Sequence, residues 1–224
     1  MVKSMASLGR TKKKIRTKVE KGWDVVLKIY SGGFTAEHLY RNEMKIVVDL
    51  QLQGLSREEI KAKIFEENLF HCRSEAAMKD LFPRVYRRTE FFDRQLKFFL
   101  LNGSRSDQNA LLLYGFLKYF KFPRDFVLEV VHYHMKKFKT TVTEGNIHTF
   151  FEEKEQQYEQ VRNWTDKTKY KLKQVMLKIL VDAELLAKNG DEYEIKPIPL
   201  SKELREYAER NESYRDLLLL TLNE

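Results

Sequence analysis

The stretch WTDKTKYKLKQVMLKILVDAELL, residues 164–186, has the spacing of one long amphipathic helix. Its apolar side chains recur at intervals of three and four residues, which is the period of one helix face. Thr165 stands directly before this pattern, where a side-chain oxygen can cap the first turn. A helix of this length predicts a fold built mainly from helices. The apolar positions are Leu172, Val175, Met176, Ile179, Ala183 and Leu186.

The polar side of this predicted helix concentrates positive charge. Between Arg162 and Lys178 there are six positive charges and one acid, Asp166. Solvated helix faces usually mix signs, and lysines in the first half of a helix oppose its dipole. We therefore predict that an external polyanion, a DNA duplex, offsets the charge, with a merely solvated face as the alternative. The predicted DNA-binding residues here are Lys167, Lys169, Lys171, Lys173, Gln174 and Lys178.

The residues after this helix suggest a wing. Asn189, Gly190 and Asp191 form a tight-turn sequence, and the alternation in EYEIKPI, residues 192–198, is that of a short strand. Ser201 is positioned to cap the next helix, and a last helix is expected over 212–223. We interpret residues 143–224, which begin with a further helix, as a winged-helix-like region.

The N-terminal half predicts a second helix-turn-helix-like element. Thr35 is placed to cap a helix that Gly54 ends, the capping box at Ser56 starts a second, and Ser74 caps a third over 75–89. Three helices with a short turn between the last two are typical of this motif, although ordinary bundles share the pattern. The third helix, with an expected apolar stripe of Ala77, Leu81 and Val85, adds four predicted DNA-binding residues: Lys79, Arg84, Arg87 and Arg88.

The middle of the chain predicts a buried core. Residues 91–138 form its most aromatic and least charged part, with helices expected over 91–103, after a Ser106 cap, and from Pro123. Only 9 Gly and 4 Pro are present, so long elements must dominate. We therefore predict an all-α globular protein in which 34–104 is the first helix-turn-helix-like region and 105–142 the central core.

Net charge alone is a poor guide to the partner. The total is +8, but residues 1–33 carry nine Lys and Arg against two acids. The remaining residues hold 32 positive and 31 negative charges, so only local clustering on the folded body can indicate a polyanion. The basic arm, residues 1–33, is expected to be a solvated tail, a nucleic-acid contact, or a targeting or expression-tag sequence.

Several classes of protein are disfavoured by what the sequence lacks. A single cysteine, Cys72, fits a reducing compartment, and no apolar run is long enough to span a membrane. Glycine-rich phosphate loops and HExxH are missing, and His148 with Glu152 one turn away has no third metal ligand in sight. We expect a cytoplasmic monomer that is not an enzyme and has no catalytic residues, no metal and no cofactor.

Three stretches, in this order and spacing, resemble the BrxA family of bacteriophage exclusion (BREX) phage-defence systems. They are FTAEHLYRNEMKIVVDLQLQGLSREEIKAKIFEENLF at 34–70, RSEAAMKDLFPRVYRR at 73–88, and the stretch at 164–186. The resemblance implies a small all-helical cytoplasmic protein that binds double-stranded DNA through two helix-turn-helix-type elements. It also implies action with the system's methyltransferase, ATPase and phosphatase-like components, and it brings no catalytic residues.

The expected function is therefore that of a non-enzymatic, DNA-binding accessory component of antiviral defence. Its DNA-facing helices would be 74–89 and 166–186, which the charge pattern selects independently. Two alternatives remain open at this stage. One is a protein-interaction adaptor that docks other defence subunits through its basic faces, and the other is an RNA-binding helical bundle.

Overall fold

The computed structural model describes residues 30–223, so the predicted arm lies outside the described residues except for 30–33. Of these four residues, Tyr30 is buried and Gly32 is partly buried. The Tyr30 ring is buried against Phe122 and Tyr158. A Cβ added to Gly32 would lie 3.3 Å from the indole nitrogen of Trp164, so the backbone here passes close to the start of the long helix.

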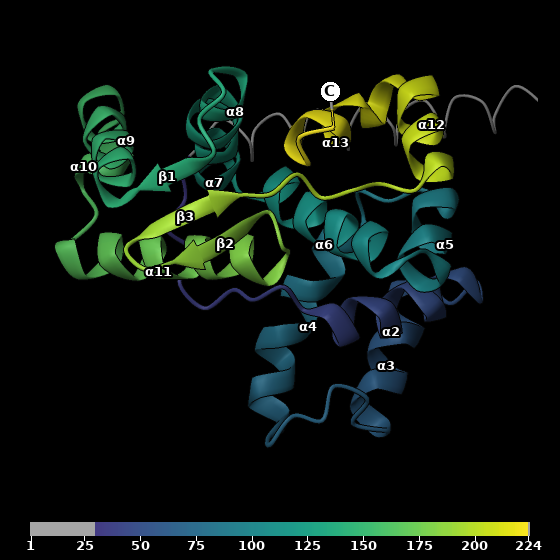
Figure 1. The fold of residues 1–224 in the computed structure, drawn as a ribbon. Helices are drawn as coiled ribbons and strands as arrows, with labels where there is room; N and C mark the ends of the chain where they lie inside the picture. The colour runs from purple at the N-terminus through teal and green to yellow at the C-terminus, as the bar shows by residue number, and fades with distance from the viewer. Residues whose placement is uncertain (1–29, 224) are drawn as a thin grey trace, which may run out of the picture.

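The first three helices form a small bundle, seen at the lower right of Figure 1. They are α2 (Arg41–Leu52), α3 (Arg57–Glu66) and α4 (Glu75–Thr89). The predicted caps Ser56 and Ser74 are confirmed, and Glu59 completes the capping box. The prediction that Thr35 caps the first helix is wrong, because Tyr40 adopts a left-handed φ of 53° and α2 begins only after it.

The central helices carry the core. They are α5 (Arg94–Asn102), α6 (Arg105–Tyr119), α7 (Lys121–Phe126), the π-helical η1 (Val127–His132) and α8 (Tyr133–Lys136). Every residue of α6 from Ala110 to Leu117 is buried, which confirms the expected core helix. Its N-cap is Ser104 rather than Ser106, whose hydroxyl instead donates to the Pro199 carbonyl.

The C-terminal half combines helices with a small sheet. It contains β1 (Thr141–Thr143), α9 (Glu144–Gln157), α10 (Glu159–Arg162), α11 (Asp166–Asp182), β2 (Leu186–Asn189) and β3 (Glu192–Ile195). The strands are antiparallel in the order β1-β3-β2, with Tyr193 facing Val142 on one side and Lys188 on the other. The fold is therefore mostly α-helical, and β1 is the element that the all-α prediction did not include.

The long helix is shorter than predicted. Thr165 caps it as expected, but it ends at Asp182 instead of reaching Leu186. Glu184 takes a left-handed φ of 66°, and this reversal turns the chain into β2. Gly190, with a φ of 59°, then makes the predicted tight turn between β2 and β3.

The chain closes on the central core. Helix α12 (Lys202–Arg210) is capped by Ser201 as predicted. The expected last helix is divided into the 3-10 turn η2 (Glu212–Tyr214) and α13 (Arg215–Leu220). Helix α13 contacts α6 and η1, so the C-terminus covers the buried middle of the chain (Figure 1).

Candidate nucleic-acid interface

Four of the predicted residues on α11 share its solvent-facing side. Lys167, Lys171, Gln174 and Lys178 are all exposed, while Leu172, Val175, Met176, Leu177, Ile179 and Leu180 are buried. The apolar stripe therefore fixes which side of the helix faces out. Lys178 pairs with Asp182 one turn later, at 2.8 Å. Within residues 30–223, Lys167 and Lys171 form no ion pair.

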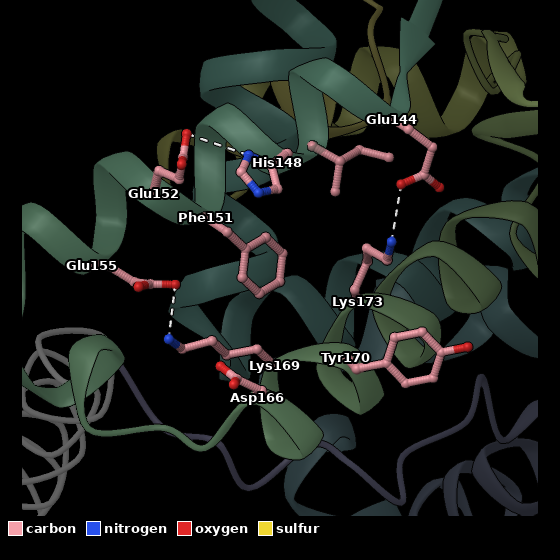
Figure 2. A pocket seen from close by; sticks show the side chains of 10 residues that line it. Glu144, His148, Phe151, Glu152, Glu155, Asp166, Lys169, Tyr170 and Lys173 are labelled. Atoms are coloured by element: carbon pink, nitrogen blue, oxygen red, sulfur yellow. Dashed lines mark hydrogen bonds and ion pairs between the residues drawn. The ribbon is translucent and has the colours of Figure 1, made fainter.

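The other two lysines of α11 are paired with carboxylates from α9. Lys169 Nζ lies 3.0 Å from Glu155, and Lys173 Nζ lies 2.9 Å from Glu144. Figure 2 shows both pairs bridging the two helices. They border a hollow of about 360 Å³ that Phe151 also lines. Part of the charge that the sequence leaves unbalanced is thus balanced by a neighbouring helix. We refer to these two pairs as the α9 carboxylate clamp.

A second hollow, of about 790 Å³, also borders Tyr170 and shares Glu144 and Lys173 with the first. One wall is α11, with Lys171, Gln174 and Lys178, and Lys188 extends it onto the hairpin. The other wall is the segment Thr35–His38, which runs beside α11 before the chain enters α2 (Figure 1). Two hollows therefore border the exposed face of α11, and lysines line both of them.

The arginines of α4 contact the segment 36–38 of the same chain. Arg84 donates to the Ala36 carbonyl, Arg87 pairs with Glu37 at 2.6 Å, and Arg88 binds Glu37 and the His38 carbonyl. These three side chains hold the segment that forms one wall of the second hollow.

Arg88, one of the predicted DNA-binding residues, has no exposed surface with which to contact DNA, because its side chain is 0% exposed. Burial lowers the pKa of this guanidinium, and the carboxylate of Glu37 opposes that effect. The sequence pattern placed Arg88 off an apolar stripe of Ala77, Leu81 and Val85. The buried stripe is in fact Met78, Phe82 and Val85, and it brings Arg88 inward.

The remaining basic residues of α4 stay at the surface. Arg84 and Arg87 are 25% and 26% exposed, and Lys79 is exposed but paired with Glu75 at 2.7 Å. The Arg87 guanidinium also lies 4.1 Å from the centre of the Tyr119 ring. A DNA contact through α4 stays a prediction, and its cations are already engaged with protein groups.

The pair expected at His148 and Glu152 is present at 3.3 Å, but the described residues contain no group of three side chains that could hold a metal ion. None of the helices over residues 30–223 is long and apolar enough to cross a bilayer.

The exposed aromatic ring of Tyr170 was missed by the sequence reasoning. It is 59% exposed on the charged face of α11 and lines both hollows. Its spacing of four residues from Gln174 was a signal that could have identified it. The partners of Lys169 and Lys173 gave no such signal, because an acidic helix surface does not reveal which lysines it will contact.

Comparison with known proteins places the chain in a family. The BrxA family pattern matches residues 28–212. The BREX protein BrxA of Bacillus cereus (strain H3081.97) is 32% identical over 167 residues, which are 75% of this chain and 84% of that protein. An uncharacterized protein from Magnetospirillum magneticum has a similar fold in its crystal structure. Its TM-score is 0.69 at 21% identity, over 86% of this chain and 98% of that one.

The family match runs from the buried Tyr30 segment through α2 to α12, and so covers both the α4 bundle and the lysine-bearing α11. The matched relative shares about a third of its residues with this chain over most of both proteins. With a family match of this extent, the chain belongs to the BrxA family.

Proposed function

We propose that this protein is a non-enzymatic component of a BREX phage-defence system that binds double-stranded DNA through α11. The name of the Bacillus cereus relative supports membership of a BREX system. The positive charge on α11 supports DNA as the partner. On this proposal the protein acts in the cytoplasm as a monomer, beside the system's methyltransferase, ATPase and phosphatase-like components.

The order of elements around α11 supports a role for it as the helix that enters the major groove of DNA. The chain runs β1, α9, α10, α11, β2, β3, and β1 pairs with β3. This is the order of a winged helix-turn-helix, with α9 as the first helix of the motif and the hairpin as the wing. In helix-turn-helix proteins the second helix lies in the major groove. On this proposal α11 is that second helix.

One observation carries the proposal: Lys167, Lys171 and Lys178 lie on one exposed face of α11, and the first two have no ion-pair partner within residues 30–223. Like charges on one helix face repel each other, and they oppose the dipole in its first half. Phosphates placed along that face would remove both penalties. Release of counterions from the duplex would add affinity that depends on salt.

The test is a salt titration of duplex binding by the intact chain. Four to six neutralised phosphates predict a slope of roughly −4 to −5 in log affinity against log salt. A slope near zero would contradict the electrostatic contact. Equal competition by single-stranded RNA would favour an RNA-binding bundle. No affinity for DNA, with stable co-purification of another defence subunit, would favour an adaptor.

A further inference from the structure

The solvent-facing side of α11 carries two side chains that can distinguish bases, and we call this pair the crest. Tyr170 and Gln174 are one helical turn apart and both exposed. Within residues 30–223 neither of them makes a side-chain hydrogen bond, and Lys173 Nζ lies 6.0 Å from the centre of the tyrosine ring. Among the described residues, the Tyr170 hydroxyl and the Gln174 amide therefore leave their hydrogen-bonding groups unused.

The lysines stand on both flanks of this pair. With 3.6 residues per turn, Lys171 and Lys178 project to one side of the crest, and Lys169 and Lys173 to the other. Tyr170 lines both hollows; Lys169 and Lys173 line the first, and Lys171 and Lys178 line the second together with Lys173. A major groove has the same arrangement, because base edges form its floor and a phosphate strand borders each side.

The chemistry of the two crest residues suits a particular base pair. A glutamine amide can donate a hydrogen bond to N7 of adenine and at the same time accept one from N6. Guanine and the pyrimidines do not offer this donor and acceptor pair in the major groove, so adenine is the usual bidentate partner of glutamine. An apolar ring contacts the methyl group of thymine. Lysine on a flexible stem contacts phosphate and carries little sequence information.

We propose that Tyr170 and Gln174 read an A·T-containing step in the major groove, while the flanking lysines contact the two phosphate strands. This proposal rests on the proposed function and adds a sequence preference to it. It makes α11 both the electrostatic contact and the base-reading element of the protein.

The experiment selects binding sites from a pool of randomised duplexes with the intact chain and with four variants. The intact chain should prefer an A·T pair over G·C at one position by about tenfold. Gln174→Ala should lose that preference, and Tyr170→Ala should lose it at the neighbouring thymine. Tyr170→Phe, which keeps the ring, should retain it. Lys171→Gln should weaken binding to all duplexes without changing their ranking.

The outcomes separate the two proposals. Both crest side chains are exposed, so the alanine variants should melt at the temperature of the intact chain. Duplex binding with the same base ranking in the intact chain, Gln174→Ala and Tyr170→Ala would overturn the base-reading role and leave the DNA-binding function standing. Failure of the intact chain to bind any duplex would overturn both.

Discussion

At the residue scale, Glu37 is the side chain on which the N-terminal half depends. Its carboxylate is buried and binds both Arg87 and Arg88, and Arg88 is fully buried. Removing one partner of a buried ion pair leaves a charge that neither water nor protein stabilises. The pair joins residues 51 positions apart, so no local pattern could have predicted it. Part of the arginine surplus on α4, at Arg87 and Arg88, is therefore explained by pairing inside the fold.

Replacing Glu37 with Gln should lower the free energy of unfolding by roughly 3 kcal/mol, because Arg88 loses its counter-charge. Asp80→Asn is the matched control, since Asp80 also pairs with an α4 arginine but is 65% exposed. That control should cost less than about 1 kcal/mol. Urea unfolding of the two variants measures the difference, and equal losses would show that Glu37 has no special structural role.

At the element scale, the α9 carboxylate clamp competes with DNA for the lysines of α11. Glu144 and Glu155 hold Lys173 and Lys169 against the neighbouring helix. Phosphates can use these lysines only when the carboxylates release them. The double variant Glu144→Gln, Glu155→Gln should therefore bind duplex DNA more tightly, by roughly two- to fivefold for each pair released.

The control for the clamp is Glu153→Gln, which removes an equal charge from an exposed position on α9. A binding isotherm at fixed salt compares affinity per charge removed. If Glu153→Gln raises affinity as much as the average clamp substitution, net charge explains the effect and the clamp does not restrain the lysines.

Elements set by local chemistry were predictable, and those set by distant pairing were not. Ser74 and Thr165 cap their helices as the sequence indicated, because a cap depends only on residues within one turn. Strand β1 is three residues long and exists through pairing with β3, some fifty positions later. Its short sequence has no period that would distinguish it from a loop.

At the scale of the whole molecule, the basic arm joins the body beside the start of α11. Tyr30 is buried and Gly32 packs on Trp164, immediately before that helix. Deleting residues 1–27 removes eight Lys and Arg but leaves this anchor intact. We expect weaker duplex binding and a shallower salt dependence, with clear residual affinity and an unchanged melting temperature. Complete loss of binding would place the DNA contact in the arm instead of α11.

The central claim is that α11 contacts the phosphates of a duplex. The most direct test is the salt dependence of duplex binding by the triple variant Lys167→Gln, Lys171→Gln, Lys178→Gln. Its control is the triple variant Lys61→Gln, Lys139→Gln, Lys202→Gln, which removes the same charge from exposed sites elsewhere. If α11 lies against the phosphates, the first variant should lower the steepness of the log–log slope by roughly 2 to 3. The control should leave the slope almost unchanged. Equal changes in both variants, or none in either, would contradict a DNA contact through α11.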